Sequence, residues 1–167
     1  PGIGGYCHGL YWHLPIPAEW LKWLHITVLE MLATGGSAIA FCAYLRAAEC
    51  IRLLSDSLAT PFVLSRHKAK SAMLSFAHHE LLRNAAYREV AERADVSHIS
   101  GSANVFGDAV SRALWKRFFA LCRAVSVRPV QVPAPPELVG ICERLVAIAQ
   151  RGGEPVRPSR YHRDAPV

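Results

Sequence analysis

The chain has 167 residues, which is enough for one domain with a proper core and too few for two comfortable ones. Its 51% apolar and 19% charged residues are typical of a globular protein and exclude a disordered one. The net charge of +6 favours an anionic partner, with nucleic acid first and a membrane surface second.

The first elements along the chain are short and apolar. Residues 4–8 and 10–14 are strand-like runs joined at Gly9, which predicts a β-hairpin. Residues 20–46 then have the pattern of one helical region, weakened at Gly35-Gly36. The apolar stretch 26–45 approaches the length of a membrane span, but Glu30 inside it would be costly in lipid. We therefore expect a buried helix and no membrane partner, with a membrane-anchored helical protein as the weaker alternative.

The middle of the chain alternates between strands and helices. We expect strands at 50–55 and 96–99, helices at 58–65 and 71–83, and one long helix at 104–125. Strands mixed with crossover helices predict an α/β domain at 1–125, in which helices flank a mixed central sheet.

The C-terminal part has a different composition. Residues 126–136 are a predicted proline-rich linker, 137–150 a further helix, and 151–167 a basic tail that we expect to be disordered.

The five cysteines form no C-x-x-C pair and leave an odd one out. We expect reduced thiols rather than a disulfide framework, which favours an intracellular compartment, either the cytoplasm or the nucleus. Neither Cys7-His8 with His13 nor His78-His79 has zinc-finger spacing.

Three acidic residues stand where an α/β fold would gather a site. Glu30 lies inside an apolar helical run, Asp56 follows the strand that ends at 55, and Asp108 comes early in the helix after 104. Converging carboxylates repel each other, so convergence would imply divalent cations, and hard oxygen ligands select Mg²⁺ or Mn²⁺. Two such ions about 4 Å apart are the usual device for phosphodiester hydrolysis.

Each acid also has a plainer interpretation. Glu30 could pair with a buried base, and Asp56 could be a turn residue or a helix N-cap. Asp108 could face solvent on a helix that Asn104 merely caps.

Taken together, these residues resemble the ribonuclease H fold, and most closely the ribonuclease H domain that follows the reverse transcriptase in DIRS-like and Ty/gypsy-like retroelement polyproteins. The run 26–30 resembles the family's first-helix I-T-x-x-E segment, and 55–57 its strand-ending T-D-[NS]. The segment 98–112 resembles the closing H-x-x-G-x-x-N-x-x-A-D-x-x-S-R, with Gly107 where alanine is usual. The glycine-rich segment 4–9 resembles the second strand of the family, and the resemblance extends over roughly residues 2–115.

The resemblance implies a metal-dependent enzyme that hydrolyses the RNA strand of an RNA–DNA hybrid and adjoins a reverse transcriptase domain. It implies that Glu30, Asp56 and Asp108 hold two Mg²⁺ or Mn²⁺ ions, and that His98 aids proton transfer or product release. Other residues would contact the substrate: Asn104 and Ser57 in the site, and Arg66, Lys68 and Lys70 at backbone phosphates. The same basic residues could instead form a solvated loop.

The sequence departs from the family in one respect. The family has a fourth acid, an aspartate in a first strand that is central in a five-stranded sheet, whereas no Asp precedes Asp56 here. We therefore expect a ribonuclease H-like fold that lacks its first strand, which would lie upstream in a longer polyprotein, and an isolated chain that is nearly inactive. The competing hypothesis is a truncated or decayed, catalytically inactive domain that only binds nucleic acid.

Overall fold

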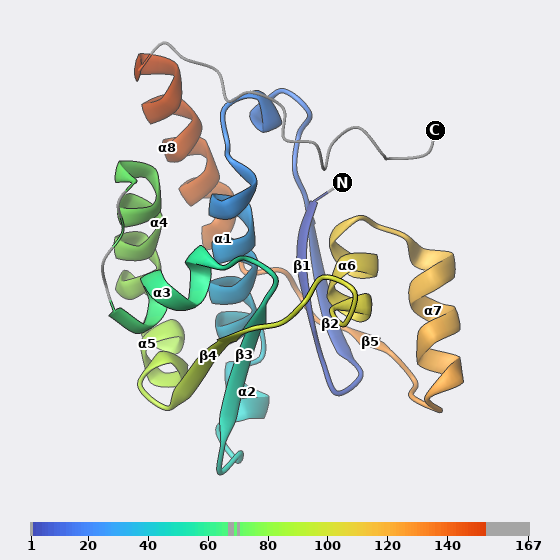
Figure 1. Ribbon diagram of the computed structural model, residues 1–167. Helices are drawn as coiled ribbons and strands as arrows, with labels where there is room; N and C mark the ends of the chain where they lie inside the picture. Colours follow the sequence, from blue (N-terminus) through green and yellow to red (C-terminus); the bar gives the residue numbers. More distant parts are fainter. Residues whose placement is uncertain (1, 67–68, 70, 153–167) are drawn as a thin grey trace.

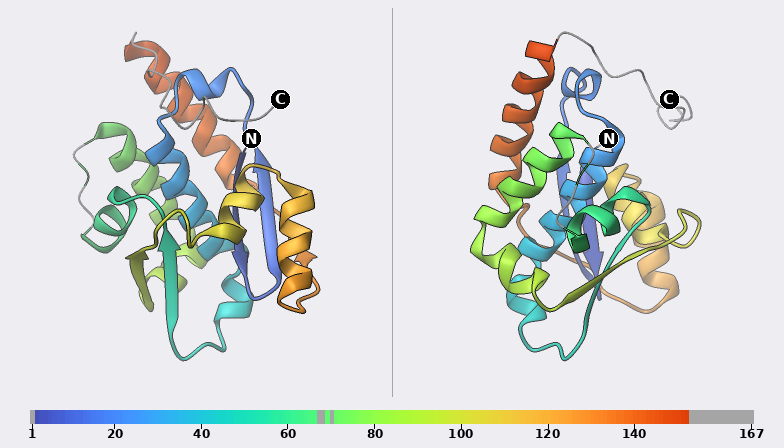
Figure 2. Two further views of the ribbon diagram at one scale, coloured as in Figure 1. Left: turned by 45° about the vertical axis from the view of Figure 1, so that its right-hand side comes forward. Right: turned by 60° about the vertical axis from the view of Figure 1, so that its left-hand side comes forward.

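The structure is a computed structural model that describes residues 2–66, 69 and 71–152. It is a mixed α/β protein, as expected, in which helices lie between and around two groups of strands (Figures 1 and 2). One sheet has the order β1-β2-β5, and the other pairs β3 with β4. Their bounds are β1 Gly2–Cys7, β2 Leu10–Pro15, β3 Ile51–Ser55, β4 Ala94–His98 and β5 Val130–Gln131. The expectation of one central sheet is therefore wrong for the described residues, because no strand joins β1 to β3.

The predicted hairpin is confirmed by the antiparallel pairing of β1 with β2. His8 and Gly9 form its turn, with φ angles of 45° and 93°. Positive φ at both central positions is the geometry that matches the right-handed twist of two paired strands. The short β5 runs parallel to β2, through Val130 and Gln131, so the predicted linker contributes to the sheet.

The helical region 20–46 consists of three pieces: η1 Trp20–Lys22, α1 Ile26–Ala40 and α2 Cys42–Leu45. The interruption lies at Phe41, and the expected weakness at Gly35-Gly36 is wrong. These glycines are buried inside α1 because neighbouring side chains approach it closely. A Cβ at Gly36 would lie 2.7 Å from Leu138 Cδ1 and 2.8 Å from Trp12 Cζ2.

The two strands of the second sheet, β3 and β4, are parallel. Three helices connect them along the chain: α3 Ala59–Arg66, α4 Ala72–Arg83 and α5 Ala85–Ala91. The two predicted helices of this region are confirmed, while α5 was not expected. It begins at Asn84, whose side-chain Oδ1 accepts a 3.0 Å hydrogen bond from the Tyr87 N–H. Helix α5 buries Tyr87 and Val90 in the main core.

The single long helix expected at 104–125 is wrong. It is divided into α6 Val105–Ser111 and α7 Trp115–Ala124 by a turn in which Ala113 has a φ of 56°. The Leu114 N–H bonds to the Ala109 carbonyl and the Ala113 N–H to the Val110 carbonyl, which is a Schellman motif. No residue of this segment signals the motif, because glycine is the usual residue at such a position and alanine stands here.

The last helix, α8 Glu137–Gly152, extends two residues beyond its predicted end and into the predicted tail. The rest of that tail, 153–167, lies outside the described residues. Helix α8 buries Leu138, Ile141 and Leu145 in the same core as α1 and α4. A smaller aromatic core lies between the hairpin and α6–α7, around Tyr11 and Phe118.

All five cysteines are free thiols, as expected. Over the described part of the chain, no helix is both long enough and apolar enough to cross a membrane.

Candidate functional site

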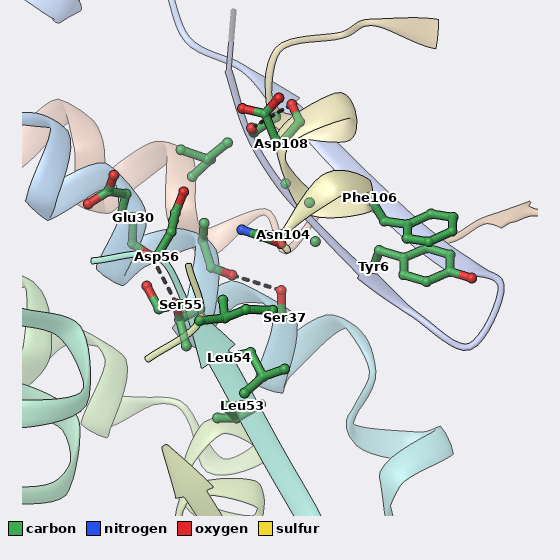
Figure 3. Close-up of a pocket in the computed structure, with 18 of the residues that line it drawn as sticks. Tyr6, Glu30, Ser37, Leu53, Leu54, Ser55, Asp56, Asn104, Phe106 and Asp108 are labelled. Atoms are coloured by element: carbon green, nitrogen blue, oxygen red, sulfur yellow. Dashed lines mark hydrogen bonds between the residues drawn. The ribbon is translucent and has the colours of Figure 1, made fainter. Parts of the chain in front are cut away.

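A groove of about 2470 Å³ separates the two sheets. One side is β1, the other is β3, and Ser37 of α1 lies between them (Figure 3). The segment before α6 and the first turns of α6 complete the lining. Within the described residues β1 pairs only with β2, and β3 only with β4. Backbone N–H and C=O groups of two strand edges therefore face the groove without strand partners.

Three separate elements bring the acidic residues Glu30, Asp56 and Asp108 to this groove. Glu30 is in the second turn of α1, Asp56 directly follows β3, and Asp108 is in the first turn of α6. In the part of the chain that the structure describes, no three His, Cys, Asp or Glu side chains are close enough to hold a metal ion. The acids thus share one groove without forming one cluster.

Glu30 and Asp56 are the two acids that interact. Burial and then the negative charge of Asp56 raise the pKa of the Glu30 carboxyl to about 7, against a smaller opposing effect of a hydrogen bond with the Ser57 side chain. Ser57 itself is buried. Near neutral pH, both the neutral and the charged form of the Glu30 carboxyl are therefore populated, and a bound cation would favour the charged form.

Asp108 is instead held by two arginines. Arg112 Nε forms an ion pair with Oδ1 at 2.6 Å, and an Arg117 guanidinium nitrogen lies 3.6 Å from Oδ2. Arg112 is one turn further along the chain, whereas Arg117 comes from α7. The side chain of Asp108 is 23% exposed, so it is a partly exposed acid whose charge two arginines offset.

Asn104 lies beside Asp108 at the start of α6. It is the N-cap residue, but its side chain makes no capping hydrogen bond, which contradicts the interpretation of a simple cap. A Cβ at position 107 would lie 2.4 Å from Asn104 Oδ1. Gly107 therefore leaves the space that the Asn104 amide occupies as it lines the groove (Figure 3).

Two other predicted site residues lie away from the groove lining. His98 is the last residue of β4, opposite Ser55 in the register, and its side chain is exposed. Arg66 ends α3 with its guanidinium carbon 5.1 Å from the centre of the Phe62 ring. Lys68 and Lys70 lie outside the described residues.

Other cationic residues line the groove: Lys22, Arg52, Arg112 and Arg117. Only Arg112 belonged to a motif that the sequence singled out. Arg117 could have been noticed as part of the basic pair Lys116-Arg117, but its approach to Asp108 depends on the turn at Ala113.

The chemistry of the donors fits a divalent cation at Glu30 and Asp56. Both supply hard carboxylate oxygens, and a cation would offset the repulsion that raises the pKa of Glu30. Asp108 would join them only after its oxygens leave the two guanidinium groups.

No family model matches the chain, and comparisons with curated proteins and with solved structures gave no match either. The function is therefore argued from the resemblance in sequence and from the groove.

Proposed function

We propose that this chain is the ribonuclease H-like part of a retroelement reverse transcriptase, and that it hydrolyses the RNA strand of an RNA–DNA hybrid with Mg²⁺ or Mn²⁺. One observation carries the proposal: Glu30, Asp56 and Asp108 line the same groove. They are far apart in sequence, and each stands on the kind of element that the resemblance assigns to it, namely a first helix, a strand end and a late helix. The net charge of +6 suits a nucleic-acid substrate.

The residues of the groove have distinct roles in this proposal. A bound cation would supply an activated water and charge stabilisation at the phosphate. Glu30 and Asp56 would hold it, and Asn104 would orient the substrate beside them. Because the pKa of Glu30 is about 7, its carboxyl must lose a proton to become a ligand, so cation binding near neutral pH should release protons.

The finer fold belongs to the same proposal. A ribonuclease H-like sheet would place a first strand between β1 and β3, and the two open strand edges and the groove between them support this position. Such a strand would pair with both edges and join the two sheets. Its aspartate would then supply the carboxylate that a cluster around Glu30 and Asp56 lacks.

A second candidate is a domain that binds nucleic acid without cleaving it. It is favoured by the contacts of Asp108, whose charge Arg112 and Arg117 offset. It is favoured also by the lack of a three-ligand group in the described residues.

Cleavage of a hybrid with a labelled RNA strand distinguishes the two candidates. We would assay the 167-residue chain and the same chain extended at its N-terminus by the preceding polyprotein sequence, each in Mg²⁺ and in Mn²⁺. The proposal expects cleavage by the extended chain, little by the short one, and none of single-stranded RNA. In the extended chain, Asp56→Asn should reduce the rate by at least about 100-fold.

Two outcomes would count against this proposal. No cleavage by the extended chain in either cation would favour the binding-only domain. Robust cleavage by the short chain would mean that the site needs no further strand.

A further inference from the structure

Asp108, Arg112 and Arg117 form a charge cluster on the wall of the groove, and all three residues line it. Two guanidinium groups contact one carboxylate, so the cluster has a net charge of +1. The cluster is accessible, because the Arg112 and Arg117 side chains are 43% and 52% exposed.

The fold places Arg117 in this cluster. Arg117 lies nine positions after Asp108. On a continuous helix the two residues would be about 14 Å apart along the axis. The turn at Ala113, where φ is 56°, reverses the chain and returns the first turn of α7 to Asp108. The second arginine is therefore a consequence of the break between α6 and α7.

These contacts are suited to exchange. Ion pairs between partly exposed side chains contribute little stability, so another ligand can replace them without large loss. Two guanidinium groups offer several N–H donors to one phosphate, in the planar geometry that phosphate oxygens prefer.

We propose that Arg112 and Arg117 bind a backbone phosphate of the nucleic acid. When neither nucleic acid nor cation is bound, the Asp108 carboxylate pairs with both guanidinium groups in place of the phosphate. This inference rests on the proposed function of the groove. When Asp108 turns toward a cation, both arginines are released, and a phosphate that takes them releases Asp108 in return. Cation and nucleic acid therefore bind cooperatively, each increasing the affinity for the other by the same factor.

The first test measures affinity for a hybrid whose RNA strand is 2′-O-methylated and so resists cleavage, by fluorescence anisotropy with Mg²⁺ and with EDTA. Mg²⁺ should increase the affinity of the unaltered chain about fivefold. Arg112→Gln and Arg117→Gln should lose most of that gain. Each should also reduce the slope of log affinity against log salt concentration by about one.

Arg123→Gln is the matched control for these variants. It removes the same charge from α7, at an exposed residue outside the groove lining. It should keep the Mg²⁺-dependent gain. Arg112→Lys and Arg117→Lys keep the charge without the planar fork, and should keep the salt dependence while losing part of the affinity.

The second test frees the arginines without any cation. Asp108→Asn should bind the hybrid several-fold more tightly than the unaltered chain in EDTA. Asp56→Asn removes the same charge from the groove without altering the arginine contacts, and should give a smaller increase. If both variants gained the same affinity for the hybrid, the gain would come only from the loss of one negative charge in the groove. That result would overturn the proposal.

The proposal is also overturned if Arg112→Gln and Arg117→Gln, folded as judged by their melting temperatures, bind the hybrid as Arg123→Gln does. These binding results are independent of cleavage. A chain that binds as expected but never cleaves would refute the proposed enzymatic function and leave the phosphate contact standing.

Discussion

Asp56 at the end of β3 opposes the ionisation of Glu30 on α1. Burial of the Glu30 carboxyl, and then the charge of Asp56, raise its pKa from the model-compound value of 4.5 to about 7. A pair of acids in this state is costly to the folded protein at neutral pH. That cost is the physical sign that an ionised Glu30 needs a positively charged partner.

Glu30→Gln should stabilise the protein at pH 8 and change little at pH 4. The folded state binds the Glu30 proton more tightly than the unfolded state, so its stabilising contribution is complete below about pH 4.5 and is lost as the pH rises through about 7. The full pKa shift would correspond to about 3 kcal/mol in the free energy of unfolding. Because the carboxyl is partly exposed to solvent, we expect roughly half of that as the gain from Glu30→Gln at pH 8. Urea unfolding between pH 4 and pH 8 measures it.

Glu92→Gln is the control for this prediction, because Glu92 is an exposed acid at the end of α5. Its free energy of unfolding should follow that of the unaltered chain across the whole pH range. If Glu30→Gln followed the same curve, the carboxyl would not be perturbed.

Divalent cations should stabilise the chain through Glu30 and Asp56. With Mg²⁺ at ten times its dissociation constant, the free energy of unfolding should rise by about 1.4 kcal/mol. The effect should be larger at pH 8 than at pH 6, because Glu30 binds a cation only when ionised. Melting curves with Mg²⁺ or EDTA measure this, and the Glu30→Gln/Asp56→Asn variant should show no shift.

Ala113→Gly should stabilise the protein by about 0.5–1 kcal/mol, because alanine is strained at a φ of 56° and glycine is not. The matched change Ala124→Gly, at the end of α7, should destabilise it by about 0.5–1 kcal/mol instead. Chemical unfolding measures both. Equal destabilisation by the two changes would contradict the left-handed turn between α6 and α7.

Gly36→Ala should destabilise the protein by about 1–3 kcal/mol although alanine favours helices, because its Cβ would press on Leu138 and Trp12. Gly140→Ala is the opposite case, since only the end of the Arg144 side chain lies near that position, at 3.3 Å. It should stabilise α8 by about 0.5–1 kcal/mol. Thermal unfolding of the two variants should therefore shift in opposite directions.

Much of the fold could be predicted because it follows from local patterns. The hairpin at Gly9, the strand before Asp56 and the helices at α3 and α4 have short-range signals in apolar periodicity and turn residues. The breaks at Phe41 and Ala113 could not be predicted, because neither residue is a usual helix breaker.

In the candidate site too, the features with local sequence signals could be predicted and those that depend on tertiary structure could not. That Glu30, Asp56 and Asp108 lie along one groove follows from their places at a helix start and a strand end, which the sequence indicates. The arginine contacts of Asp108 depend on tertiary structure, because Arg117 reaches it only through the turn between two helices. His98 was selected by its motif, and its exposed position on the outer strand could not be foreseen.

Within the part of the chain that the structure describes, one edge of β1 and one edge of β3 have no strand partner. These edges also bear on how this chain behaves at high concentration. An unpaired strand edge is a template for any other extended chain, including that of a neighbouring copy. Leu54, whose side chain is 48% exposed, adds apolar surface at this place. Isolated copies should therefore tend to self-associate and precipitate as concentration rises, and a short peptide that caps both edges should suppress this aggregation.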